Sequence, residues 1–263
     1  MQPIYISLTS IYQNQRVLLK TLNSIVKQTL LPSRIFVYLS KEPYLMDTGF
    51  RLGEITYGPL RAMLQEYSTI ISVQFVPNEG SFRKLLPLLK EKWNEKCIII
   101  TIDDDTVYIP TFISDIVSDY YREDCVINYR GFTPNITDIR ELTYENRLPI
   151  IQHRHLYNFP TGKAGILYCP HFFHKTGDLI FHKDIYMKSC ATSDDTWFML
   201  VRVLNEIDCY LDEKPYMTAD NTKSDVSLFC NYNSGANNTI QIRNTILKIF
   251  RHVPKLGTPK GCT

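Results

Sequence analysis

The sequence predicts an α/β protein with a mostly parallel, twisted sheet, helices on both faces and a mixed region toward the C-terminus. In the first half of the chain, apolar β-branched segments alternate with segments of helical periodicity, and prolines and glycines separate them. This alternation is typical of parallel sheets, because a crossover helix returns the chain to the same end of the sheet. The 263 residues, 44% of them hydrophobic, suffice for a sizeable core.

The first strand and helix are marked by a change of period. Residues 3–8 are apolar and β-rich, whereas residues 16–28 carry apolar side chains at helical spacing. Pro32 ends that helix, and the apolar segment 34–39 predicts the second strand. The chain therefore opens as strand, helix, strand.

Two more helices and two more strands follow in the same order. A glycine–proline pair precedes a helix over 60–67, and residues 70–76 predict the third strand. Residues 82–93 have helical periodicity, and the apolar run 97–102 predicts the fourth strand. Ligands of such sheets bind beyond the carboxyl ends of the strands, so polar residues there are the first candidates for a site.

The alternation weakens after a further helix at 110–121. Short strands, aromatic residues and turn residues fill 125–190, which favours a mixed sheet region and loops that close over a cleft. An amphipathic helix begins at Ser193, and a last one spans 239–250. We expect residues 1–263 to form one domain.

Charge and cysteine content narrow the class of protein. Lys and Arg number 29 and Asp and Glu 27, so no net charge argues for a nucleic-acid partner. The seven cysteines are widely spaced and form no C-x-x-C pair, which disfavours a zinc site and a disulfide framework. The start lacks a basic leader, and no apolar run approaches the ~20 residues that span a bilayer. We therefore expect a cytoplasmic chain without a transmembrane segment.

Three consecutive aspartates, Asp103, Asp104 and Asp105, follow the strand 97–102. Adjacent carboxylates raise one another's pKa and repel, so a cation or several hydrogen-bond donors must neutralise the cluster. Mg²⁺ and Mn²⁺ prefer oxygen ligands and are commonly held by one or two carboxylates and by substrate phosphates. The cluster indicates metal-assisted chemistry on a phosphate-bearing substrate, with a solvated acidic turn as the alternative.

Several common motifs are absent from the sequence. No G-x-G-x-x-G follows the first strand, and no G-x-x-x-x-G-K-[ST] occurs. G-x-S-x-G and H-E-x-x-H are also missing. Dinucleotide oxidoreductases, P-loop NTPases, serine hydrolases and zinc peptidases thus lose their main signal.

Five motifs lie in register along the chain: Ser24–Gln28, Gly80–Leu85, Ile100–Asp105, Ala164–Tyr168 and Asp194–Trp197. In this order and spacing the chain resembles nucleotide-sugar-dependent glycosyltransferases of the GT-A fold, in particular the bacterial and viral type with an Asp-Asp-Asp metal motif. The resemblance covers residues 3–250 and departs from the pattern at Ala164, where a glycine is usual. It implies a nucleotide-sugar-binding half at 1–122 and an acceptor-side half at 123–263.

The resemblance also implies a Mn²⁺ or Mg²⁺ cofactor at the acidic cluster. Asp105 would ligate the metal that bridges the diphosphate, and Asp103 would contact the metal and the nucleotide. Asp104 would face the sugar, because carboxylates also accept hydrogen bonds from sugar hydroxyls.

Other implied substrate-binding residues lie at strand ends and turns. Thr9, Ser10 and Arg16 would form the pocket for the base and ribose. Lys84, or Arg83 in the same turn, would meet the phosphates at a helix start. A solvated lysine in the first turn of a helix and an exposed arginine are the structural alternatives.

Ser40, at the end of the second strand, could reach the base, and Gly165 could let the backbone approach the sugar. Asp194 and Asp195 begin a helix, where capping and the helix dipole alone favour acidic residues. The resemblance gives them a catalytic role, with Asp195 as the general base of an inverting enzyme or as a sugar-binding group of a retaining one. His252 is a candidate for a late metal ligand.

The function predicted from the resemblance is transfer of a hexose from a nucleotide-diphosphate sugar, a UDP-sugar in most relatives, to a glycan or another hydroxyl acceptor. Loops 130–160 and 215–238 are the candidates for the acceptor site. A sugar-phosphate nucleotidyltransferase is one alternative, although the glycine-rich basic loop of such enzymes is absent at 9–16. An inactive sugar-binding protein on the same fold is another.

Overall fold

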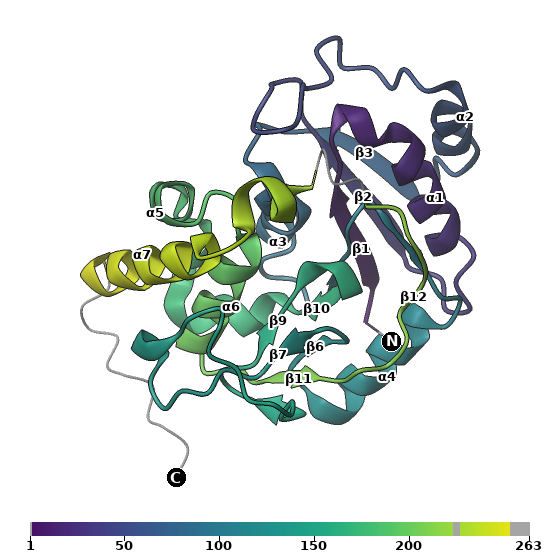
Figure 1. Ribbon diagram of the computed structural model, residues 1–263. Helices are drawn as coiled ribbons and strands as arrows, with labels where there is room; N and C mark the ends of the chain where they lie inside the picture. Colours follow the sequence, from purple (N-terminus) through teal and green to yellow (C-terminus); the bar gives the residue numbers. More distant parts are fainter. Residues whose placement is uncertain (1, 223–226, 253–263) are drawn as a thin grey trace.

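A computed structural model describes residues 2–222 and 227–252 of the chain (Figure 1). Its centre is an eight-stranded sheet with helices on both faces, which confirms the predicted fold class. In spatial order the strands of this sheet are β3 (Ile71–Phe75), β2 (Arg34–Leu39), β1 (Ile4–Thr9), β4 (Ile98–Thr101), β10 (Ile166–Tyr168), β6 (Val126–Asn128), β11 (Cys209–Leu211) and β8 (Arg154–His155).

The sheet is parallel in one half and mixed in the other. β3, β2, β1 and β4 run parallel, whereas β10 is antiparallel to both β4 and β6. β11 is parallel to β6 and antiparallel to β8. All four residues of β4 are buried, as expected for a central strand covered on both faces. The mixed half contains the region in which the sequence pattern weakens.

Helices α1 and α2 lie on the side of β1–β3, whereas α6 lies beside the other half of the sheet and α7 packs on α5 and α6 (Figure 1). The α-helices are α1 (Gln15–Ile25), α2 (Gly58–Glu66), α3 (Leu86–Glu91), α4 (Phe112–Glu123), α5 (Lys183–Ser189), α6 (Asp194–Leu204) and α7 (Asn237–His252). The 3₁₀ segments are η1 (Tyr12–Asn14), η2 (Gly80–Lys84), η3 (Ile139–Glu141), η4 (Gly162–Ala164) and η5 (Pro170–Phe181), and η7 (Phe229–Asn233) is a π-helix.

Two short ladders stand outside the main sheet. β5 (Thr106–Tyr108) pairs with β12 (Met217–Asp220), and β7 (Gly131–Phe132) pairs with β9 (Phe159–Pro160). β5 directly follows the three aspartates, so the β5–β12 ladder brings a late part of the chain beside the acidic cluster. The sequence pattern predicts neither ladder.

The predicted helix over 82–93 is wrong in its first part. The chain forms η2 up to Lys84, leaves helical geometry at Leu85, and begins α3 only at Leu86. The reason is Pro87, which lacks an amide hydrogen and whose ring would clash with the carbonyl four residues earlier in a continuous helix. Lys84 therefore ends a 3₁₀ turn and does not stand at a helix start.

Polar side chains at the end of helix α1 and just beyond it form hydrogen bonds with the backbone that follows the acidic cluster. Ser24 Oγ accepts a hydrogen bond from the Tyr108 amide at 3.1 Å. Gln28 donates from Nε2 to the Ile109 carbonyl at 2.6 Å and accepts at Oε1 from the Ile113 amide at 2.9 Å. The Ser24–Gln28 motif thus has a structural role, because its two polar side chains fix the backbone beyond the aspartates.

Two further features of the described residues bear on the sequence expectations. No described helix combines the length and the apolar composition that crossing a bilayer requires. The six described cysteines are free thiols, and Cys262 lies outside the described residues.

Candidate active site

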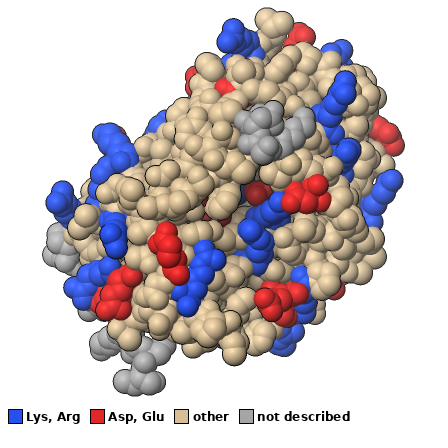
Figure 2. Space-filling model, in the orientation of Figure 1, with Lys and Arg blue, Asp and Glu red and all other residues tan. Residues whose placement is uncertain are grey.

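A cavity of about 600 Å³ lies beyond the carboxyl ends of β1 and β4. Figure 2 shows the molecule hollowed near its middle, with acidic and basic side chains around the hollow. Most predicted site residues line this cavity: Thr9, Ser10, Arg83, Lys84, Asp103, Asp104, Asp105, Asp194 and Asp195. The chain brings them together from four separate elements, β1, η2, the turn after β4 and the start of α6.

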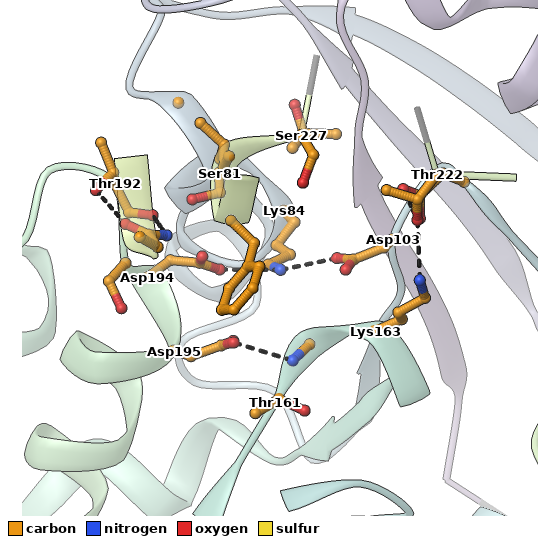
Figure 3. A pocket seen from close by; sticks show the side chains of 18 of the residues that line it. Ser81, Lys84, Asp103, Thr161, Lys163, Thr192, Asp194, Asp195, Thr222 and Ser227 are labelled. Atoms are coloured by element: carbon orange, nitrogen blue, oxygen red, sulfur yellow. Dashed lines mark hydrogen bonds and ion pairs between the residues drawn. The ribbon is translucent and has the colours of Figure 1, made fainter. Parts of the chain in front are cut away.

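Lys84 lies between two carboxylates at the centre of the cavity (Figure 3). Its Nζ is 2.9 Å from Asp103 Oδ1 and 3.0 Å from Asp194 Oδ2, and only 6% of its side chain is exposed. Burial alone would lower the pKa of Lys84, but Asp103, Asp194 and Asp195 together raise it well above its usual value. The ammonium therefore stays charged and neutralises part of the acidic site.

The three consecutive aspartates point to three different partners. Asp103 meets Lys84, whereas Asp104 accepts hydrogen bonds from Ser10 Oγ and from Asn14 Nδ2, the latter at 3.2 Å. Burial, and next the charge of Asp105, raise the pKa of Asp104 to about 7. Ser10 and Asn14 hold this carboxylate at the end of β1 and at η1, and Asp104 still lines the cavity, so its role toward a sugar stays a prediction.

Asp105 contacts the segment that follows β12. Thr222 donates to Asp105 Oδ2 at 2.7 Å and the Asn221 amide donates to the Asp105 carbonyl at 2.8 Å. Lys163 in η4 binds both Asp220 and Thr222 (Figure 3). The segment after β12 is therefore bound to the acidic turn through Asp105 and to η4 through Lys163.

Asp194 and Asp195 begin helix α6, as the sequence predicts. Asp194 pairs with Lys84, whereas Asp195 Oδ2 accepts a hydrogen bond from the Gly162 amide at 3.1 Å. Asp195 Oδ1 is buried, and none of the described residues donates a hydrogen bond to it. Buried polar atoms normally have a partner, so this oxygen is a natural acceptor for a ligand hydroxyl.

The environment of Asp195 changes its acidity. Burial, and next the charge of Asp194, raise its pKa to about 7, while Lys84 acts in the opposite direction. A carboxylate that gains and loses a proton near neutral pH suits general base catalysis.

The surroundings of Gly162 show how closely three charged groups of the cavity approach one another. A methyl group at its Cα would lie 2.5 Å from Lys84 Nζ, 3.2 Å from Asp195 Oδ1 and 3.3 Å from Asp103 Oδ1. The ammonium and both carboxylates therefore face nearly the same point, and glycine is needed for its small size.

Arg83 makes a buried ion pair at the other wall of the cavity. Its Nη2 is 3.2 Å from Asp47 Oδ2, and each side chain is 2% exposed. Its Nε donates to the Gly80 carbonyl at 3.0 Å, while Nη1 is buried and donates to no described residue. Nη1 thus offers a free donor beside the cavity.

Three predicted substrate-binding residues lie outside this set. Arg16 is exposed on α1, with its guanidinium 5.4 Å from the centre of the Tyr57 ring. Ser40 is fully buried, and its Oγ accepts from the Glu42 amide. Gly165 is buried with φ +72°, and a methyl group there would lie 2.5 Å from the Phe112 ring, so its glycine serves backbone conformation and packing.

The proposed late metal ligand is also placed elsewhere. His252 lies near the end of α7 with its ring 4.1 Å from that of His182. It is not among the residues that line the cavity.

The acidic turn offers a small donor set for a metal ion. No group of three or more His, Cys, Asp or Glu that could hold a metal occurs within residues 2–222 and 227–252. Asp103 and Asp105 nevertheless share one turn, and after burial the charge of Asp103 is the main cause of the raised pKa of Asp105. Two oxygen-donor carboxylates fit an ion such as Mg²⁺, which completes its coordination with substrate phosphates and water.

Sequence reasoning missed the residues that anchor the site: Asn14, Asp47, Lys163, Asp220 and Thr222. For Lys163 the one early signal was its position directly before the Ala164–Tyr168 motif. Asp47 could have been sought as the partner that a buried Arg83 requires.

Comparison of the fold with solved structures gives three informative neighbours. S. aureus TarS (residues 1–349) in complex with UDP matches with a TM-score of 0.52 and 15% identity over 95% of this chain and 72% of that one. The same protein in complex with UDP-GlcNAc matches with a TM-score of 0.50 and 16% identity over 85% of this chain and 59% of that one. The fold is GT-A-like.

The GT-A-like fold is not limited to one chemistry. A 4-diphosphocytidyl-2C-methyl-D-erythritol synthase matches with a TM-score of 0.51 and 7% identity over 85% of this chain and 94% of that one. No protein-family model matches the sequence, and no curated protein matches it. Structural matches at such low sequence identity establish the fold alone, so the function has to be argued from the site itself.

Proposed function

We propose that this chain is a metal-dependent glycosyltransferase that moves a hexose from a UDP-sugar to a hydroxyl acceptor. The observation that carries the proposal is Asp195 Oδ1, a buried oxygen without a donor, on a carboxylate of pKa about 7 in the same cavity as the acidic turn. TarS, which shares the fold, was solved with UDP and with UDP-GlcNAc, and this supports a UDP-sugar as donor.

The donor would lie between β1 and the acidic turn. Thr9 and Ser10 line the cavity at the end of β1, where the base and ribose would bind. The diphosphate would meet the charge of Lys84 and the free Nη1 of Arg83. When bound by Asp103 and Asp105, Mn²⁺ or Mg²⁺ would neutralise charge on the leaving diphosphate.

The acceptor would approach from the side of Asp195. Its hydroxyl oxygen forms the new bond to the anomeric carbon while the bond from that carbon to the diphosphate oxygen breaks, and the electron pair leaves with the diphosphate. The hydroxyl proton passes to Asp195 Oδ1, and the Gly162 amide holds Oδ2 meanwhile. A displacement from the face opposite the leaving group inverts the configuration at the anomeric carbon.

Calorimetry with UDP, with and without Mn²⁺, tests the proposal. We expect UDP to bind more tightly with Mn²⁺, and we expect Asp105→Ala to remove that difference because one of the two carboxylates is lost. Asp184→Ala is the matched control, since Asp184 is exposed, does not line the cavity and pairs with Lys188 in α5. If UDP failed to bind the wild-type chain under both conditions, the proposal would fall.

A second assay separates the alternative enzyme class. The chain is incubated with nucleotide sugars and, in parallel, with nucleoside triphosphates plus sugar phosphates. Release of UDP from a UDP-sugar supports the proposal, whereas release of pyrophosphate would assign a nucleotidyltransferase.

A further inference from the structure

Two arginines on the acceptor side of the cavity, Arg130 and Arg147, form no ion pair within the described part of the chain. The other basic residues of the cavity wall are each matched with a carboxylate: Arg83 with Asp47, Lys84 with Asp103 and Asp194, and Lys163 with Asp220. Both residues are exposed, so water solvates their guanidinium groups and an anionic ligand can reach them from the cavity.

Arg147 is held in place before any ligand arrives. Its guanidinium lies 4.0 Å from the centre of the Phe132 ring and 4.4 Å from that of Tyr144. Its Nε donates to the Tyr144 carbonyl at 2.7 Å, and its backbone pairs with Pro134. The two Nη groups donate to none of the described residues. A guanidinium fixed in this way loses little further entropy when it binds an anion.

Arg130 is linked to the catalytic carboxylate through a short chain of contacts. Its Nη1 donates to Thr161 Oγ1 at 2.9 Å. Thr161 precedes Gly162, whose amide donates to Asp195. Arg130 therefore reaches Asp195 through Thr161 and Gly162, at the end of the cavity where the acceptor is proposed to bind. The aromatic side chains of Tyr144 and Phe159 also line this side.

We propose that the acceptor carries an anionic group, a phosphate or a carboxylate, near the hydroxyl that is glycosylated, and that Arg147 and Arg130 bind that group. The inference rests on the proposed function, since it names the acceptor class of the same site. Guanidinium groups bind carboxylates and phosphates through paired, charge-assisted hydrogen bonds. A neutral glycan would leave both guanidinium groups to water, whereas an anionic acceptor would pair with them beside aromatic surface that either acceptor could use.

The experiment compares three sugars with one ring: glucose, glucuronate and glucose 6-phosphate. Each is titrated by calorimetry into the full chain with Mn²⁺, once with UDP and once without it. We expect at least one anionic sugar to bind about tenfold more tightly than glucose, as one charge-assisted contact provides. The preference should weaken as salt increases. Whether glucuronate or glucose 6-phosphate binds better distinguishes a carboxylate from a phosphate acceptor.

Substitution of the two arginines tests whether they cause the preference for an anionic sugar. Arg147→Gln and Arg130→Gln should each reduce the preference several-fold and leave UDP affinity unchanged. Arg140→Gln is the matched control, because Arg140 pairs with Asp138 on the surface and does not line the cavity. It should retain the full preference.

Three results would overturn the inference. One is the absence of any preference for an anionic sugar over glucose, and another is a preference that survives in Arg147→Gln and Arg130→Gln. The third is an equal loss of UDP affinity in these variants, which would assign the arginines to the donor. Failure of the wild-type chain to bind UDP would instead refute the proposed function, and the titrations without UDP would still decide the sugar preference.

Discussion

Replacing Lys84 by methionine tests whether its charge holds the site together. The side chain is 6% exposed and reaches two carboxylates at 2.9 and 3.0 Å, so Lys84→Met keeps most of the volume but leaves Asp103 and Asp194 without their cation. Removing one partner of a buried ion pair costs about 3–5 kcal/mol. Because Asp103 remains 32% exposed and water can solvate it, we expect the lower end, about 3 kcal/mol.

Urea unfolding at pH 7, followed by circular dichroism, measures this loss. Adding Asp194→Asn to Lys84→Met should restore part of the stability, since it removes the unpaired buried carboxylate. The deficit should also shrink at lower pH, because the unpaired carboxyls can then take up protons. The control is Lys175→Met, whose exposed pair with Glu206 is worth at most about 1 kcal/mol. A loss of less than 1 kcal/mol in Lys84→Met would refute the reasoning.

Two further predictions concern the catalytic end of the cavity. Because the pKa of Asp195 is about 7 and a base must be deprotonated, kcat/KM should rise with pH through about 7, and Asp195→Asn should abolish that rise and lower the rate by about 10²–10⁴. A rate that does not change with pH would contradict the assignment of Asp195 as the base. The same raised pKa means that the contribution of Asp195 to stability is present below pH 3.8 and is lost as pH rises toward 7. Gly162→Ala should impair turnover strongly and stability by about 1 kcal/mol, since its methyl group would displace the Lys84 ammonium. Gly58→Ala, where a methyl group meets nothing within 4 Å, should retain full activity, and equal behaviour of the two variants would count against the crowded geometry at Gly162.

Much of the fold was predictable because its signals are local. Apolar segments of period two and segments of period 3.6 gave the parallel strands and helices, with boundaries shifted by a few residues. The acidic turn could be placed at the end of a central strand for the same reason. Pro87 is also visible in the sequence, but the apolar periodicity of 82–93 predicted one continuous helix, whereas the chain breaks helical geometry at Leu85.

The orientation of site residues depended on partners far along the chain and was not predictable. Asp104 turns to Ser10 and Asn14, about ninety residues earlier, and Asp105 turns to Thr222. Strand β12 is exposed at every position, so its sequence shows no alternation of apolar and polar residues that would predict a strand. Arg16 was predicted in the base and ribose pocket but lies on the exposed face of α1. One residue along a helix turns the side chain by about 100°, so Gln15 is buried while the next residue, Arg16, is exposed.

The hydrogen bonds from Ser24 and Gln28 to the backbone beyond the acidic turn have a consequence for how the protein folds. They join residues 81 to 85 positions apart, and the neighbouring β1–β4 pairing joins residues even farther apart, such as Ile4 and Ile98. Contacts of such high sequence separation form only after the entropy of closing a long loop has been lost, which slows folding. The acidic turn therefore takes its shape in the same step that docks α1 onto β5 and β1 onto β4. A nascent chain that ends before that docking has the aspartates but not the cavity at the strand ends, so binding of UDP, the proposed ligand, would report completion of the parallel half of the sheet.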